Sequence, residues 1–63
     1  MHHLFIGLPV YNGERFLREA IDSLLAQSHK NLTLYISDDA STDETQNICT
    51  QYAAQDARVV YHR

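Results

Sequence analysis

Short apolar runs alternate with amphipathic stretches along this 63-residue chain, and that alternation limits its folds more than any other feature. The run Leu4–Val10 is apolar at nearly every position and is too short for a typical helix. Such a run is typical of a parallel strand that is buried on both faces. Pro9 has no N–H to donate, so we expect it near the end of that strand.

Two later runs, 32–37 and 58–62, are rich in β-forming residues and predict two further strands. The stretches between the strands carry apolar residues at helical spacing. In the predicted helix 13–27 the inward stripe is Phe16, Leu17, Ala20, Ile21, Leu24 and Leu25. In the predicted helix 42–55 the stripe is weaker and comprises Thr45, Ile48, Cys49, Tyr52 and Ala53. Ser41 and Glu44 have the spacing of a capping box for the second helix.

The resulting order, β-α-β-α-β, predicts an α/β unit with a parallel sheet and right-handed crossovers. Ligands of open α/β sheets bind beyond the carboxyl ends of the strands. Those ends are residues 9–12, residues 38–41 and the residues that follow Tyr61. Gly7 and Gly13 form neither of the glycine-rich motifs that hold phosphates. A nucleotide at this edge would therefore be held mainly by its base or ribose.

Length sets a second limit, because a chain of about 60 residues buries only ~60% of the surface that it exposes when unfolded. Cys49 is the one cysteine, so no disulfide forms within the chain, and no zinc-binding spacing is present. We expect either a fragment of a larger domain or a unit that associates through its open sheet edges. The net charge of −3 and the scattered basic residues argue against nucleic-acid binding. No apolar run approaches the ~20 residues of a membrane span.

Two adjacent carboxylates, Asp38 and Asp39, follow the second predicted strand. Neighbouring strand residues point to opposite faces, so one carboxylate would face a ligand and the other would hold the loop. A carboxylate only accepts hydrogen bonds, and it therefore selects a base with a ring N–H, such as uracil, thymine or guanine. Tyr11, at the neighbouring strand end, can stack on such a base. The pattern leaves a second interpretation open, in which Asp38 and Asp39 serve the loop and the cap and Tyr11 packs as an ordinary amphipathic residue.

Other interpretations fit the residues less well. A calcium loop around Asp38 would need a glycine that is missing. In phospho-receiver domains a carboxylate pair follows the first strand, whereas here it follows the second. Cys49 lies on the inward stripe and is expected to be a core residue. His29 and His62 are expected to be surface histidines.

Three segments resemble the opening of the family 2 glycosyltransferases, which have the GT-A fold. They are Leu-Pro-Val-Tyr-Asn-Gly-Glu (8–14), Ser-Leu-Leu-Ala-Gln (23–27) and Ile-Ser-Asp-Asp-Ala-Ser-Thr-Asp-Glu-Thr (36–45). The resemblance covers essentially the whole chain in order and spacing. It implies that residues 1–63 are the N-terminal, nucleotide-binding part of a Rossmann-like GT-A domain, without the metal-binding and acceptor parts.

Family members transfer a sugar from a nucleotide-activated donor, often a UDP- or dTDP-sugar, to a saccharide, lipid or other acceptor. Such reactions serve polysaccharide and cell-envelope glycan synthesis. The resemblance places Tyr11 against the uracil ring, Asp39 on the base N3–H and Pro9 beside the base. It makes Asp38 mainly structural, although close to the base. Thr42, Asp43 and Thr45 are assigned to capping the second helix.

The resemblance also implies a divalent metal, Mg²⁺ or Mn²⁺, which an Asp-x-Asp motif binds further along the family's chains, as well as a later catalytic base. We therefore expect no catalytic residue and no metal ligand in this chain, and no turnover by the chain alone. The implied partners are a nucleotide-sugar donor and a glycan or lipid-linked acceptor. We expect the full-length protein to lie in the cytoplasm or at the inner membrane surface. The alternative is a stand-alone βαβαβ module for nucleotide binding or dimerisation, without catalysis.

Overall fold

The computed structural model describes residues 3–27 and 31–63. It contains β1 (Leu4–Val10), α1 (Leu17–Leu25), β2 (Leu32–Asp38), α2 (Thr45–Gln55) and β3 (Val59–His62). The predicted α/β class and the predicted order of elements are therefore confirmed. The expectations for His29 and for most of the break after the first helix lie outside the described residues.

The three strands form one parallel sheet in the order β1-β2-β3. The register pairs Val10 with Asp38 and Ser37 with His62, so all three strands end at the same edge. Asp39 extends the pairing by one residue, because its N–H donates to the carbonyl of Val10 at 3.0 Å. This edge brings the predicted site residues together.

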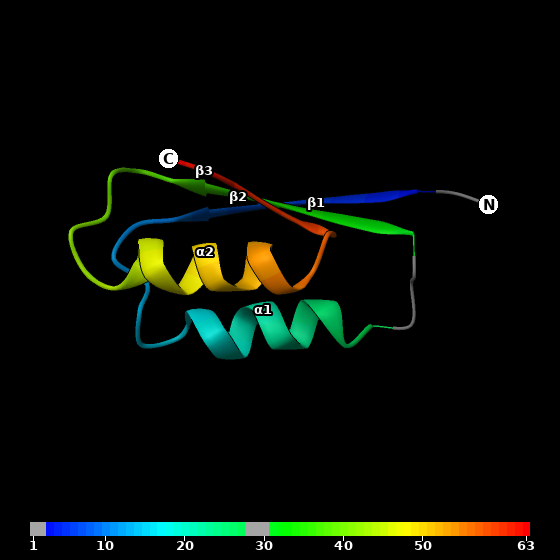
Figure 1. Cartoon of the computed structure of the whole chain (residues 1–63), viewed down its shortest axis with the longest axis horizontal. Coiled ribbons are helices and arrows are strands. Elements are labelled where there is room, and N and C mark those ends of the chain that lie inside the picture. Colours follow the sequence, from blue (N-terminus) through cyan, green and yellow to red (C-terminus); the bar gives the residue numbers. More distant parts are fainter. Residues whose placement is uncertain (1–2, 28–30) are drawn as a thin grey trace.

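Both helices cover the same face of the sheet (Figure 1). Two right-handed crossovers that step in the same direction across a sheet place their helices on one side. On the helix face of β1, Val10 is buried and Ile6 and Leu8 are partly buried, whereas Phe5 on the other face is 63% exposed. The prediction that this strand is buried on both faces is therefore wrong for the described residues, none of which covers the second face.

The hydrophobic core lies between the sheet and the two helices. The strands contribute the residues of their helix face, and the helices contribute one stripe each. The buried members are Val10, Leu17, Ile21, Leu34, Ile36, Ile48, Cys49 and Val59. Cys49 is fully buried, as its place on the inward stripe predicts.

The first helix is shorter than predicted because a turn precedes it. The N–H groups of Phe16 and Leu17 both donate to the carbonyl of Gly13, at 3.1 and 2.9 Å. Phe16 therefore lies before the first full turn and is 51% exposed, so its predicted place on the inward stripe is wrong. A Cβ on Gly13 would lie 2.6 Å from Cγ2 of Val10, so this position requires glycine for lack of space.

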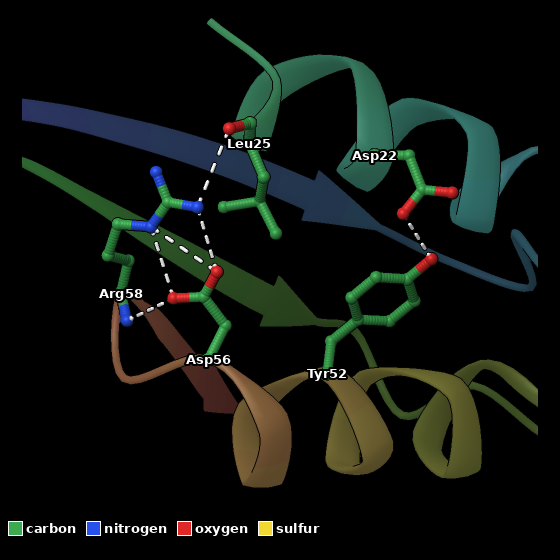
Figure 2. Close-up of polar contacts among 5 residues, drawn as sticks. All are labelled: Asp22, Leu25, Tyr52, Asp56 and Arg58. Carbon is green, nitrogen blue, oxygen red and sulfur yellow. Dashed lines mark hydrogen bonds and ion pairs between the residues drawn. The ribbon is translucent and has the colours of Figure 1, made fainter. Parts of the chain in front are cut away.

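Polar contacts join the two helices and the start of β3 (Figure 2). The hydroxyl of Tyr52 on α2 donates to Oδ1 of Asp22 on α1 at 2.6 Å. Arg58 forms an ion pair with Asp56 at 2.8 Å, and its guanidinium also reaches the carbonyl of Leu25 at 3.5 Å. These contacts fix α2 against α1 and lead the chain into β3. Neither described helix is long and apolar enough to cross a membrane.

Candidate functional site

A cleft of about 690 Å³ lies at the carboxyl ends of the strands. It is lined by Pro9, Val10, Tyr11, Ser37, Asp38, Asp39, His62 and Arg63. All four residues predicted from the sequence to bind a nucleotide, Pro9, Tyr11, Asp38 and Asp39, are therefore brought to one place. The parallel register explains this, because it aligns the ends of β1 and β2.

The four residues differ sharply in exposure. Tyr11 is 61% exposed, and Asp39 and Pro9 are exposed as well. Asp38 is only 5% exposed, because it is the last residue of β2 on the helix face. The cleft therefore presents an aromatic ring and one carboxylate to solvent, while the neighbouring carboxylate is buried beneath them.

Asp38 uses both carboxylate oxygens within the protein. Its Oδ1 accepts hydrogen bonds from the N–H of Ser41 at 3.0 Å and from the Ser41 hydroxyl at 2.5 Å. Its Oδ2 accepts a hydrogen bond from the hydroxyl of Tyr61 at 2.5 Å. Burial opposes ionisation, but the hydrogen bonds from Ser41 and Tyr61 outweigh it and hold the pKa of Asp38 below its ordinary value. Asp38 is therefore an anionic anchor for the β2–α2 loop.

The same geometry decides whether the described residues fit a divalent metal. A cation such as Mg²⁺ needs carboxylate oxygens that converge on one point. Asp38 is buried and already engaged by Ser41 and Tyr61, whereas Asp39 is exposed. Across residues 3–27 and 31–63, no three His, Cys, Asp or Glu side chains come together as metal ligands. The described residues therefore do not fit the metal that the resemblance implies.

Hydrogen bonds join the β1–α1 loop to the β2–α2 loop. Three consecutive N–H groups, those of residues 12, 13 and 14, each donate to a side chain of the β2–α2 loop or of the first residue of α2. The acceptors are the Ser41 hydroxyl at 2.9 Å, the Thr45 hydroxyl at 2.9 Å and Oδ2 of Asp43 at 3.3 Å. In return, the N–H of Thr42 donates to Oδ1 of Asn12 at 2.8 Å. We call these contacts the interloop network.

The interloop network corrects the predicted cap of the second helix. The helix begins at Thr45, with Glu44 as an N-cap that makes no side-chain capping hydrogen bond, so the predicted capping box is wrong. The hydroxyls of Ser41 and Thr45 serve the other loop instead. Asp43 does serve the start of the helix, as predicted, because its Oδ1 accepts from the N–H of Thr45 at 2.9 Å, while its Oδ2 serves the β1–α1 loop. The local spacing of the sequence predicted that these short polar side chains would accept hydrogen bonds from backbone N–H groups. It did not predict that the donors would belong to the β1–α1 loop.

Four residues that line the cleft were not among the predicted binding residues, namely Val10, Ser37, His62 and Arg63. Ser37 and His62 are paired across β2 and β3, and both line the cleft. His62 is exposed, as expected. Arg63 donates to the carbonyl of Ser41 at 3.2 Å and to the side chain of Gln46. The sequence placed the residues that follow Tyr61 at this edge of the sheet, and the register of β3 decides that His62 and Arg63 reach the cleft.

The sequence of this chain matches a known family of proteins. Residues 5–63 match the family model for glycosyl transferase family 2. The chain belongs to this family. The predicted membership is confirmed, and the β-α-β-α-β unit is consistent with the N-terminal, Rossmann-like region of a GT-A domain.

Curated relatives of this family 2 chain are much longer than it is. The chain is 39% identical over 54 residues to the glycosyltransferase GlyA of Streptococcus pneumoniae, covering 86% of the chain and 8% of GlyA. It is 36% identical over 54 residues to GlyG of the same organism, with 86% and 18% covered. It is 51% identical over 47 residues to RP339, an uncharacterized glycosyltransferase of Rickettsia prowazekii, with 75% and 15% covered. The chain thus spans only a small part of the length of each relative.

Proposed function

We propose that this family 2 segment binds the base of a UDP- or dTDP-sugar, for a glycosyltransferase that passes the sugar to a saccharide or lipid-linked acceptor. The observation that carries the proposal is the cleft itself. An exposed aromatic ring, Tyr11, and an exposed carboxylate, Asp39, line one cleft where a parallel sheet ends. That edge is the usual ligand site of open α/β sheets.

The chemistry of the two side chains selects the base. The Asp39 carboxylate accepts hydrogen bonds only, so it pairs with a ring N–H and repels the N3 acceptor of cytosine. Uracil and thymine offer N3–H and guanine offers N1–H, and the family favours the first two. Stacking of a base on Tyr11 adds ~1–3 kcal/mol whichever base is present. Pro9 gives the base an apolar border. Asp38 supports the site from below through its bonds to Ser41 and Tyr61.

The proposal assigns this chain the recognition of the donor, and no step of sugar transfer is derived from its residues. The divalent metal and the catalytic base that the family implies would come from other parts of the full-length protein. The acceptor would be a glycan or a lipid-linked glycan in polysaccharide or cell-envelope synthesis, and the reaction would take place in the cytoplasm or at the inner membrane surface.

Affinity for UDP tests the proposal directly. In the full-length protein we expect Asp39→Asn and Tyr11→Ala each to weaken UDP binding by about tenfold or more, measured by calorimetry. Tyr11→Phe keeps the ring and should bind UDP as before. Because an amide both donates and accepts, Asp39→Asn should also narrow the preference for UDP over CDP.

A matched control separates the loss of base recognition from the effect of removing one negative charge anywhere on the protein. Glu19→Gln removes one negative charge from the exposed side of α1, away from the cleft, and should leave UDP affinity unchanged. If Asp39→Asn leaves both the UDP affinity and the UDP-to-CDP ratio as they are, the pairing of carboxylate and imide is wrong.

The second candidate function is a free-standing module that binds a nucleotide or dimerises. It is favoured by the open face of the sheet, where Phe5 is 63% exposed and Tyr35 is 40% exposed, with their rings stacked at 6.0 Å. Exposed apolar patches of this kind are covered in many proteins by another chain or domain. Membership in a transferase family makes the first candidate the better supported one.

A further inference from the structure

One hydroxyl group joins the two loops that carry Tyr11 and Asp39. Ser41 is 3% exposed, and its Oγ donates to Oδ1 of Asp38 while it accepts from the N–H of Asn12. Asn12 follows Tyr11 in the chain, and Ser41 follows Asp39 by two residues. The Ser41 oxygen therefore links the two segments that carry the binding side chains, alongside the bond from Asp39 to the carbonyl of Val10 and the bond from Thr42 to Asn12.

The backbone on each side of this oxygen is tightly turned. Asn12 has a φ of 47° and Ala40 has a φ of 52°, both in the left-handed region. Such residues lie where the chain changes direction sharply, and their conformation persists only when neighbouring contacts hold it. The bonds of Ser41 to Asp38 and to Asn12 are contacts of that kind. The backbone bond from Ser41 to Asp38 holds the turn that carries Asp39, and the hydroxyl contact with Asn12 holds the direction in which Tyr11 leaves β1.

We propose that Ser41 is a positioning residue of the base site, whose hydroxyl fixes the direction of the Tyr11 ring relative to the Asp39 carboxylate. The proposal rests on the proposed function, since it takes Tyr11 and Asp39 as the groups that bind the base. Ser41 itself touches no base. It acts through the N–H of Asn12, and its effect should therefore depend on the presence of the Tyr11 ring.

A double-mutant cycle measures this dependence. In the full-length protein we expect Ser41→Ala to weaken UDP binding by about fivefold to tenfold, because one hydrogen bond holds the loop. In a Tyr11→Ala background the same change should alter UDP affinity by less than about twofold, since the ring to be positioned is gone. The fall in melting temperature should be similar in both backgrounds. A merely structural role predicts the same loss of affinity with and without Tyr11, and that result would overturn the proposal.

Two further variants keep the test sharp. Ser41→Thr retains the hydroxyl and should recover most of the UDP affinity that Ser41→Ala loses. Thr50→Ala removes a hydroxyl that donates to the carbonyl of Gln46 at 2.7 Å on the exposed side of α2, and it should leave UDP affinity unchanged. Equal losses for Thr50→Ala and Ser41→Ala would contradict the inference.

Asn12→Gly tests the reverse contact between the loops. Glycine tolerates the left-handed φ and keeps the N–H that donates to Ser41, but it removes the oxygen that holds the N–H of Thr42, so it should weaken UDP binding less than Ser41→Ala does. If Ser41→Ala does not fold, Ser41→Cys, whose thiol is a weaker acceptor, carries the same cycle with Tyr11→Ala, with the same prediction and the same contradiction. Different results would contradict the proposed function and the positioning role of Ser41. An unchanged UDP affinity in Tyr11→Ala would defeat the proposed function, whereas additive losses would defeat only the role of Ser41.

Discussion

Ala40 adopts a left-handed backbone conformation that is unusual for a residue with a Cβ. Its φ is 52°, in the turn between the exposed Asp39 and the buried Ser41. This region costs an alanine roughly 1–2 kcal/mol, whereas glycine adopts it readily. The turn persists because Asp38 accepts two hydrogen bonds from Ser41. The strain is therefore local to the loop that presents Asp39.

We predict that Ala40→Gly stabilises the protein by about 1 kcal/mol, after allowance for the greater freedom of glycine in the unfolded chain. For a domain of this size that corresponds to a rise in melting temperature of roughly 4–8 °C, measured by circular dichroism. Ala54→Gly is the matched control, because Ala54 is exposed within α2, and it should lower stability by about 0.5–1 kcal/mol. If both variants lose stability equally, the left-handed turn stores no strain.

At the scale of elements, one hydrogen bond closes β2 against β3 at the edge where the cleft lies. The hydroxyl of Tyr61 on β3 donates to Oδ2 of Asp38 at the end of β2. Burial and this bond to Asp38 raise the pKa of Tyr61 to about 12, from an ordinary value of 10.0. Because the folded pKa is raised, the contribution to stability is complete below about pH 10 and is lost as the pH rises through about 12.

A tyrosinate absorbance titration checks this pairing. Of the four tyrosines, Tyr61 should ionise near pH 12, and Tyr61→Phe should remove that last phase. In Tyr35→Phe, which also loses one tyrosine but leaves β3 intact, the phase near pH 12 should remain. In denaturant all four tyrosines should ionise in one phase at about pH 10. A phase near pH 12 that survives in Tyr61→Phe would show that the Asp38–Tyr61 bond does not hold the phenol neutral.

The bounds of the helices and strands show which features of the fold could be predicted from the sequence and which could not. β1 is predicted at its observed bounds, and α2 ends at the predicted residue, because apolar spacing and turn residues are local signals. The starts of both helices are misplaced by about three or four residues. The side chains and N–H groups expected to begin each helix are instead engaged across the two loops, as in the bond from Gly13 to Thr45. Such contacts join residues about 30 positions apart and leave no periodic trace in the sequence.

At the scale of the whole molecule, a single layer of helices and one sheet must bury the core. Cys49 lies in that core and is fully buried. Burial, with a smaller contribution from the charge of Asp38, raises the pKa of its thiol to about 11. A thiol in this state reacts slowly, because the thiolate is the nucleophile and the side chain is enclosed. The lone cysteine therefore reports on whether the 63-residue chain is folded.

We predict that a thiol reagent labels Cys49 about 100- to 3,000-fold more slowly in the folded chain than in denaturant, at about pH 8. A core in so short a chain supplies ~3–5 kcal/mol, and each ~1.4 kcal/mol slows labelling of the closed state by tenfold. Labelling at equal rates with and without denaturant would mean that these residues do not hold a stable core by themselves. An intermediate rate that rises with temperature would be the signature of local opening.

Taken alone, the sequence determined the class of fold, the order of the elements, the family and four of the residues that meet at the cleft. The fold class, the order and the cleft residues follow from apolar periodicity, from turn residues and from the rule that parallel strands end at one edge, whereas the family follows from the resemblance of three short segments. All of these signals lie in residues that are close together in the sequence. Only the tertiary structure decided which carboxylate is buried, that one sheet face is open, and that Ser41, Asp43 and Thr45 serve the other loop. Those outcomes depend on strand register and on hydrogen bonds between distant segments, where the geometry of the packed chain selects one partner among several that are chemically equivalent.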